Sequence, residues 1–266
     1  MNRIVEHFEE LRARREPAFI PYIAAGDPTL DVTELLVYEF ERAGADIIEF
    51  GVPFSDPVAD GLVNQEAAQR ALKNNVSLHD IVALVGRLRP NTKIPIVLFS
   101  YFNPILAYGL DEFAADAADA GVDGVLCVDL PPEEAGDYKR LLEAKDIATV
   151  FLIAPTSTDE RIGLITRNAS GFVYYVSRTG VTGEREDIDS TVSDMVGRIR
   201  RHTDIPVAVG FGISTPEQAS VVAGYADGVV VGSAIVRMIG ALGDSPQTPQ
   251  KVGAFVRSLV DATKGR

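Results

Sequence analysis

The stretch Asp46-Ile47-Ile48-Glu49-Phe50-Gly51 is an apolar run that is too short for a helix and that ends in glycine. These features are typical of a buried β-strand. A carboxylate near the end of such a strand, here Glu49, is costly to ionise unless a partner compensates its charge. The segment that follows, residues 52–61, carries two prolines and two further acids, Asp56 and Asp60. Acids at a strand end and on the following loop favour proton transfer, with satisfaction by backbone N–H groups as the structural alternative.

Similar apolar runs recur along the chain and alternate with amphipathic stretches. The predicted strands are Phe19–Ala24, Asp46–Phe50, Pro95–Phe99, Gly124–Val128, Thr149–Ile153, Gly171–Val176, Pro206–Val209 and Asp227–Val231. The predicted helices between them are Val32–Arg42, Leu78–Leu88, Leu110–Ala120, Glu133–Glu143, Asp159–Arg167, Ser190–Arg201, Pro216–Ala223 and Gln250–Leu259. Continuous apolar strands separated by helices indicate a parallel sheet covered by helices.

Roughly eight such units favour a closed (β/α)₈ TIM barrel, which usually takes about 250 residues, over a doubly wound open sheet. Three helices are predicted in addition: one at the N-terminus (residues 1–8), one after the second strand (Asn64–Lys73) and one after the eighth (Ala234–Met238). A polar loop is predicted from Ser177 to about Asp189. Because no linker or change of composition interrupts the pattern, residues 1–266 are expected to form a single domain.

Composition narrows the possible partners. The net charge of −13 weighs against nucleic acid, whose phosphates demand a basic surface. No apolar run approaches membrane-spanning length, and the first residues do not read as a signal peptide. The single cysteine, Cys127, lies in a predicted strand and fits a reducing compartment. We therefore expect a cytoplasmic protein with no nucleic-acid or membrane partner.

Barrel enzymes place their chemistry at the carboxyl ends of the strands. Glycines follow the last three predicted strands at Gly183, Gly212 and Gly232, and Ser233 opens a helical stretch directly after the last of these. Glycine lets backbone approach an anion closely, and a helix N-terminus offers free N–H groups. These strand ends therefore predict a phosphate-binding site.

Residue types that are absent from the strand ends exclude several reactions. None of the six lysines falls there, which weighs against a Schiff base. The three histidines lie on predicted helices or just before a loop, which weighs against a zinc site, and no dinucleotide-binding motif follows the first strand. Acid–base chemistry on a phosphorylated small molecule remains, and magnesium bound by Glu49, Asp56, Asp60 or Asp129 stays open as an alternative.

Several segments resemble the tryptophan synthase α subunit family, in the family's order and over essentially the whole chain. These segments are Glu49–Gly61, Tyr101–Ile105, Asp123–Pro131, Ser177–Gly183 and Val209–Ser214. The resemblance implies a (β/α)₈ barrel that cleaves indole-3-glycerol phosphate to indole and glyceraldehyde 3-phosphate. It implies no cofactor in this chain and an αββα complex, in which a β subunit carries pyridoxal phosphate and receives the indole.

The resemblance also implies roles for single residues. Glu49 is the expected acid–base group, and Asp60 is expected to hold the indole N–H and to stay ionised. The implied phosphate ligands are Gly183, Gly212, Gly232 and Ser233. Tyr174 is expected to position Glu49 or the glycerol chain, and the expected lining of the indole pocket is Tyr22, Phe102, Leu126, Ile153 and Phe211.

Two small departures from the family pattern follow the loop acids, namely Leu62 in place of a proline and Asn64 in place of an aliphatic residue. Their effect on the loop is open. Two alternative functions also remain at this point. One is another phosphate-binding barrel enzyme, such as the synthase that makes indole-3-glycerol phosphate, although strand-end lysines are missing. The other is a non-catalytic subunit that only activates a β partner, although Glu49 and Asp60 are both present.

Overall fold

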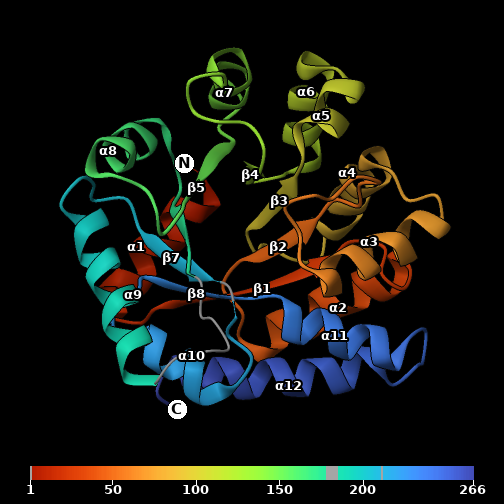
Figure 1. Cartoon of the computed structure of the whole chain (residues 1–266). Coiled ribbons are helices and arrows are strands. Elements are labelled where there is room, and N and C mark those ends of the chain that lie inside the picture. Colours follow the sequence, from red (N-terminus) through yellow and green to blue (C-terminus); the bar gives the residue numbers. More distant parts are fainter. Residues whose placement is uncertain (1, 178–184, 211) are drawn as a thin grey trace.

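The computed structural model is a closed barrel of parallel strands surrounded by helices (Figure 1), and it describes residues 2–177, 185–210 and 212–266, with only the backbone of 185–190. The strands follow one another around the barrel in chain order. They are β1 (Ala18–Ala24), β2 (Ile48–Gly51), β3 (Ile96–Ser100), β4 (Gly124–Cys127), β5 (Ala148–Ile153), β6 (Val173–Val176), β7 (Val207–Gly210) and β8 (Gly228–Val231). The predicted (β/α)₈ TIM barrel is confirmed.

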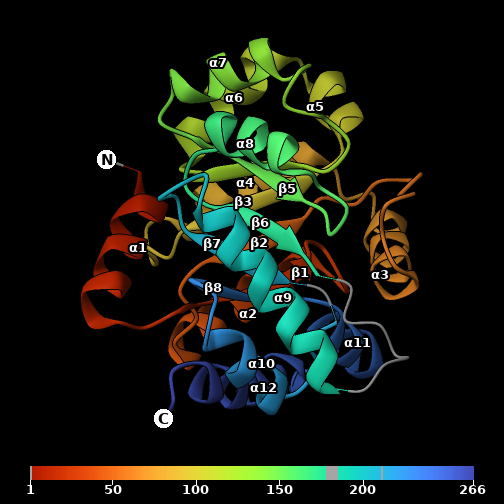
Figure 2. The same ribbon diagram turned by 60° about the vertical axis from the view of Figure 1, so that its left-hand side comes forward.

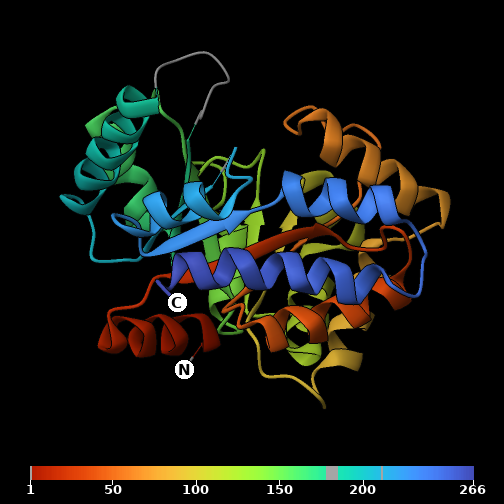
Figure 3. The same cartoon turned by 90° about the horizontal axis from the view of Figure 1, so that it is seen from below.

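The helices form the outer layer and close one end of the barrel. They are α1 (Arg3–Arg14), α2 (Leu30–Ala43), α3 (Leu62–Lys73), α4 (Leu78–Leu88), α5 (Phe102–Tyr108), α6 (Leu110–Ala120), α7 (Gly136–Glu143), α8 (Asp159–Asn168), α9 (Arg185–Arg200), α10 (Pro216–Ala223), α11 (Ser233–Leu242) and α12 (Thr248–Thr263). Figure 3 shows the dark blue α12 running alongside the orange-red α2, against which it packs. No helix in the described part of the chain is long and apolar enough to cross a membrane.

The predicted additional helices are all present as α1, α3 and α11, and each is longer than its sequence pattern indicated. Helix α5 was not predicted, because its seven residues are too few to show an amphipathic period. The predicted loop after the sixth strand is wrong at its end, since α9 already begins at Arg185. The first turns of α9 are so rich in acids that no apolar period marks them. The rest of that loop, residues 178–184, lies outside the described residues.

Side-chain alternation along the strands divides the core into two layers. Residues that point outward, such as Ile48 and Phe50, pack against the helices. Residues that point inward form a separate cluster, and α1 adds Ile4, Phe8 and Leu11 to it. Figure 2 shows α1 at one side of the barrel and α3 at the opposite side. Helix α1 therefore plugs the amino end of the barrel and leaves the carboxyl end open to solvent.

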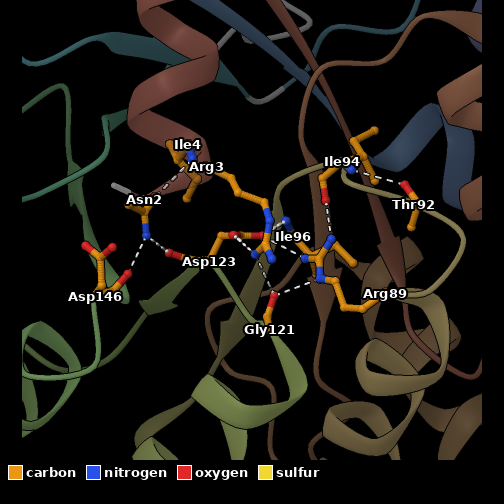
Figure 4. A network of polar contacts seen from close by, with 10 residues as sticks. All are labelled: Asn2, Arg3, Ile4, Arg89, Thr92, Ile94, Ile96, Gly121, Asp123 and Asp146. Carbon is orange, nitrogen blue, oxygen red and sulfur yellow. Dashed lines mark hydrogen bonds and ion pairs between the residues drawn. The ribbon is translucent and has the colours of Figure 1, made fainter.

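A buried acid at the amino end of β4, Asp123, ties this plug to the barrel (Figure 4). Its carboxylate accepts hydrogen bonds from Arg3 at 2.7 Å, from Arg89 at 2.7 Å and from the Ile96 backbone N–H at 2.8 Å. Asn2 caps α1 and donates to the Asp123 carbonyl oxygen at 2.7 Å. The Asp123 carboxylate thus connects α1, the end of α4 and β3 to the start of β4.

We expect Asp123→Ala to lower the free energy of unfolding by about 3–5 kcal/mol, because it leaves the largely buried Arg89 without its counter-charge. The matched control is Asp137→Ala, which breaks an exposed pair with Arg140 and is expected to cost less than about 1 kcal/mol. Urea unfolding followed by circular dichroism compares the two variants. Equal losses in both would show that the Asp123 network does not hold the barrel together.

Candidate active site

Glu49 takes an inward-facing position on β2, between two residues that point to the helix layer. Its side chain is 1% exposed, and its Oε1 atom has no hydrogen-bond partner among the described residues. Burial alone raises the pKa of Glu49 to about 8. The group is therefore protonated at neutral pH and able to donate a proton, as the sequence led us to expect.

Two buried tyrosines lie near Glu49 inside the barrel. Tyr22 stands next to Glu49 in the β1–β2 register, and Tyr174 comes from β6. Burial raises the pKa of both phenols; the charges of Asp60 and then of an ionised Glu49 add to this effect for Tyr22, and the charge of an ionised Glu49 adds to it for Tyr174. Both hydroxyls accordingly remain protonated and keep a hydrogen to donate.

Each tyrosine hydroxyl lies over a glycine of a neighbouring strand. A Cβ atom on Gly51 would lie 2.1 Å from the Tyr22 Oη atom, and one on Gly210 would lie 2.2 Å from the Tyr174 Oη atom. Contacts this short are impossible, so any side chain there displaces a phenol. Gly51 and Gly210 are thus required by close approach, and backbone strain plays no part because neither has a positive φ.

The second acid, Asp60, lies on the loop that follows β2. The Tyr101 hydroxyl donates to Asp60 Oδ2 at 3.0 Å and accepts from the Ala59 backbone N–H at 2.9 Å. The Phe54 ring packs against Tyr101 with 5.1 Å between ring centres. One tyrosine at the end of β3 therefore fixes both the loop and its carboxylate.

Burial raises the pKa of Asp60, and the hydrogen bond from the Tyr101 hydroxyl opposes that shift, followed by the nearby Asn64 side chain. This differs from Glu49, for which no hydrogen bond from a described residue opposes the effect of burial. A carboxylate that accepts a hydrogen bond is favoured in its charged form. The two acids therefore differ in their environment, although the ionisation of Asp60 at neutral pH stays a prediction.

Both acids line one cavity of about 360 Å³ at the carboxyl end of the barrel. Its apolar wall is provided mainly by Phe99, Val128, Leu152, Val176, Ile213 and Val230. A smaller hollow of about 230 Å³ lies beside α1 at the opposite end, and neither Glu49 nor Asp60 reaches it. The larger cavity has the size of a small-molecule site that combines an apolar body with a few convergent polar groups.

The predicted phosphate ligands Gly212, Gly232 and Ser233 lie together on the wall of this cavity. Gly232 precedes α11, whose N-terminus has no side-chain cap and no acid in its first turn. No described side chain therefore caps its first N–H groups, which are suited to bind an anion. Gly212 adopts φ +79°, a backbone conformation that disfavours larger residues. The fourth predicted ligand, Gly183, lies outside the described residues.

Of the residues that were expected to line the indole pocket, Tyr22 faces the cavity. Three others, Ile153, Leu126 and Phe102, do not line it. Ile153 points outward into the helix layer. Leu126 points inward but is fully buried in the barrel interior, one inward-facing position below Val128. Phe102 opens α5 and packs edge-on against Tyr138. Phe211 lies outside the described residues.

The cavity is lined instead by residues that were not predicted from the sequence, above all Phe99, Val128 and Leu152. The alternation of inward-facing and outward-facing side chains along each strand could have identified these residues. Leu152 stands beside Tyr174 in the β5–β6 register, so the two share the inward face, whereas Ile153 stands beside Tyr175. Asn64, at the start of α3, also lines the cavity.

The acids that were considered for magnesium do not gather at one point. Asp129 accepts from the Phe102 backbone N–H at 2.7 Å, and Asp56 lies exposed beside Ser55. Among residues 2–177, 185–210 and 212–266, no group of three or more His, Cys, Asp or Glu side chains is arranged to hold a metal. The described donors therefore do not build the magnesium site that composition left open.

The fold and this cavity are those of a barrel enzyme whose small-molecule site lies at the carboxyl ends of the strands. The family model described as tryptophan synthase alpha chain matches residues 8–264. The tryptophan synthase alpha chain of Pelobacter propionicus is 48% identical and covers 100% of this chain and 99% of its own. That of Citrifermentans bemidjiense is 50% identical and covers 97% of each.

Solved structures of tryptophan synthase are also similar to this chain. The tryptophan synthase subunit alpha of Legionella pneumophila has a TM-score of 0.90 at 36% identity, covering 100% of both chains. An aminoacrylate-bound form of Mycobacterium tuberculosis tryptophan synthase gives 0.88 at 34% identity, covering 99% of this chain and 100% of that one. The chain belongs to the tryptophan synthase alpha chain family. It is therefore a lyase of tryptophan biosynthesis, which removes the alternative of an unrelated barrel enzyme.

We expect Gly51→Ala and Gly210→Ala each to lower kcat/KM for the cleavage of indole-3-glycerol phosphate by about 10²-fold, since a shift of 1 Å in an active-site group can cost that much. The control is Gly136→Ala on α7, where a Cβ meets no atom within 4 Å. Steady-state assays with thermal unfolding separate misplacement from unfolding. Wild-type activity in both active-site variants would show that the tyrosine hydroxyls need not lie where they are.

We expect Glu49→Gln to stabilise the fold increasingly as pH rises. Below about pH 4.5, the ordinary pKa of the group, Glu49 is protonated in both folded and unfolded wild-type chains. Between about 4.5 and 8 only the unfolded chain ionises, so wild-type stability falls with pH, and above about 8 the loss is complete. Urea unfolding at pH 4.5, 6.5 and 8.5 measures the difference between the chains. A difference that does not change with pH would contradict the raised pKa.

Proposed function

We propose that residues 1–266 act as one catalytic domain that cleaves indole-3-glycerol phosphate to indole and glyceraldehyde 3-phosphate, with Glu49 and Asp60 as the catalytic acids. The observation that carries the proposal is a protonated, buried carboxyl and a hydrogen-bonded carboxyl on the wall of one cavity. The reaction needs an electron sink, because a carbon–carbon bond breaks and leaves an electron pair. An indole ring protonated at C3 supplies that sink.

Glu49 serves two proton transfers in this scheme. The protonated carboxyl first donates to indole C3, which places a positive charge on the ring and leaves Glu49 as a carboxylate. The carboxylate then takes the proton of the adjacent glycerol hydroxyl while the bond from C3 to the glycerol carbon breaks. The released electron pair neutralises the ring, the hydroxyl carbon becomes an aldehyde, and Glu49 is protonated again. Atoms and charge balance without an added cofactor.

Asp60 accepts the indole N–H and stabilises the positive charge on the ring between these transfers. Its loop position gives it a hydrogen bond from the Tyr101 hydroxyl, which favours the carboxylate form. The apolar wall described above receives the ring. The phosphate binds to backbone N–H groups at Gly212, Gly232 and Ser233 at the open end of α11.

The partner of this chain is a tryptophan synthase β subunit, and pyridoxal phosphate belongs to that subunit. Three large apolar side chains support a docking surface beside the active site: Val58 is 89% exposed, Leu62 is 70% exposed and Leu106 is 54% exposed. They lie on the loop after β2, on α3 and on α5. The hydrogen bond from the Ala59 N–H to the Tyr101 hydroxyl connects the loop after β2 to the residue that precedes α5. We place the assembled αββα enzyme in the cytoplasm.

We expect Glu49→Gln to lower the single-turnover rate of cleavage by about 10²–10⁴-fold, with more lost if both proton transfers fail. Binding of an indole-propanol phosphate analogue, measured by calorimetry, should be largely kept because glutamine preserves the shape. In the wild type, kcat/KM should fall above about pH 8, where the free enzyme loses the Glu49 proton. A Glu49→Gln rate within tenfold of wild type would remove Glu49 from the mechanism.

The remaining alternative is a non-catalytic subunit that activates a β partner. It predicts that the wild-type chain gives no indole, with or without a β subunit, and yet raises β-subunit activity. Turnover by the purified chain, measured in both conditions, separates this alternative from the proposed function.

A further inference from the structure

The loop after β1 carries a buried acid, Asp27, whose partner comes from α3. The Asp27 side chain is 1% exposed, and the Arg70 guanidinium donates to its two carboxylate oxygens at 2.7 and 2.8 Å. Two such hydrogen bonds fix the direction between the partners as well as their distance. Asn74, at the end of α3, donates from its side chain to the Pro28 carbonyl oxygen at 2.6 Å. Helix α3 is therefore tied to the end of β1 at two points.

The Arg70 guanidinium also lies against α11. A Cβ atom on Gly240, in the second half of that helix, would lie 2.6 Å from Arg70 Nη2 and 3.1 Å from Arg70 Cζ. A contact of 2.6 Å is impossible, and Nη2 cannot simply turn away because it is itself bonded to Asp27. The glycine thus lets α11 approach the guanidinium closely.

The other end of α11 is seated on Tyr22. Val236, in the first turns of α11, belongs to a small apolar cluster with Tyr22 of β1 and Ala67 of α3. A Cβ atom on Gly232 would lie 3.2 Å from the Tyr22 ring. Helix α11 is therefore supported by Tyr22 near its N-terminus and by Arg70 in its second half.

The direction of α11 matters because the helix presents its uncapped N-terminus to the cavity. Its ten residues turn as one rigid unit, so a tilt at Gly240 displaces the N–H groups near Gly232 and Ser233. Hydrogen bonds from N–H groups to an anion weaken when their distance and angle depart from the favoured geometry. Any loss of support at Gly240 should therefore be felt at the phosphate.

We propose that Arg70 is a positioning residue for the phosphate subsite. By holding α11 against α3 and the end of β1, it keeps the first N–H groups of α11 directed at the phosphate. Arg70 is not among the described residues that line the cavity, so it acts through the helix and not by touching the substrate. The inference rests on the proposed function, which places the phosphate at this helix.

The test measures two affinities by calorimetry, with inorganic phosphate as the probe of the phosphate subsite and indole as the probe of the apolar wall. Arg70→Lys keeps a positive charge beside Asp27 but loses the planar pair of hydrogen bonds. We expect it to weaken phosphate binding about tenfold, the size of one hydrogen bond to a charged group, and to leave indole binding unchanged. In turnover, KM should rise by the same factor while kcat is kept, because the phosphate takes no part in the chemical step.

The matched control is Arg87→Lys on α4, which makes the same change in a more exposed pair with Glu34 of α2. It should alter neither affinity. A loss of phosphate affinity in Arg87→Lys equal to that in Arg70→Lys would overturn the inference, because the effect would then follow from any such exchange.

Gly240→Ala tests the same contact from the side of α11. Its methyl group should push the helix off the guanidinium and weaken phosphate binding. The loss should vanish in a chain that also carries Arg70→Ala and Asp27→Asn, which removes the guanidinium without leaving a buried charge unpaired. Losses that simply add would show that Gly240 acts independently of Arg70.

Wild-type phosphate affinity in both Arg70→Lys and Gly240→Ala would overturn the inference. An equal loss of phosphate and indole affinity would also overturn it, because that result indicates a general loosening of the barrel mouth. Gly232→Val is measured alongside. If it keeps wild-type phosphate affinity, the phosphate binds elsewhere, and the proposed subsite fails together with the inference. If it loses phosphate binding while Arg70→Lys and Gly240→Ala do not, only the role of Arg70 fails.

Discussion

The carboxyl end of this barrel is organised by the burial of Glu49, which has no counter-charge among the described residues. The side chain faces inward because β2 alternates, and its strand neighbours Ile48 and Phe50 are committed to the helix layer. Burial alone raises its pKa to about 8. A single inward-facing carboxyl thus becomes a proton donor at neutral pH, and the groups around it are those that leave it neutral: phenols and apolar walls in place of cations.

A buried carboxyl without a counter-charge lowers the free energy of unfolding, and interactions away from the cavity compensate for this loss. Among the described residues, four side-chain atoms are buried without partners: Glu49 Oε1 and Asn64 Oδ1, whose residues line the cavity, and Tyr138 Oη and Thr149 Oγ1, whose residues do not. At the amino end the buried acids are paired: Asp123 binds two arginines, and Asp46 binds Lys264 at 2.8 Å. Helix α1 closes that end with apolar side chains. The buried acids Asp123 and Asp46 are therefore paired at the amino end of the barrel, whereas Glu49 at the cavity has no partner among the described residues.

The barrel itself was predictable, because short apolar runs and amphipathic stretches alternate with a regular period. Glu49 and Asp60 were predictable as a pair of acids at a strand end and on its loop. The apolar lining was not, because a choice between Leu152 and Ile153 depends on a one-residue register that apolar composition leaves ambiguous. Helix α5 was too short to show a period. The need for Gly51 and Gly210 comes from phenols that are distant in sequence, so it appears only when the strands are brought together.

The different tasks of the two acids follow from where the backbone places them. In a parallel barrel the backbone N–H groups around Glu49 are already used in the ladders to β1 and β3, so none is free to solvate its carboxyl. Asp60 lies on a loop, where the Tyr101 hydroxyl at the end of the next strand donates a hydrogen bond to it. The strand residue therefore stays neutral and the loop residue is favoured as a carboxylate. Neither a lysine nor a metal is needed to separate them, because the sheet removes hydrogen-bond donors from one acid and the loop supplies them to the other.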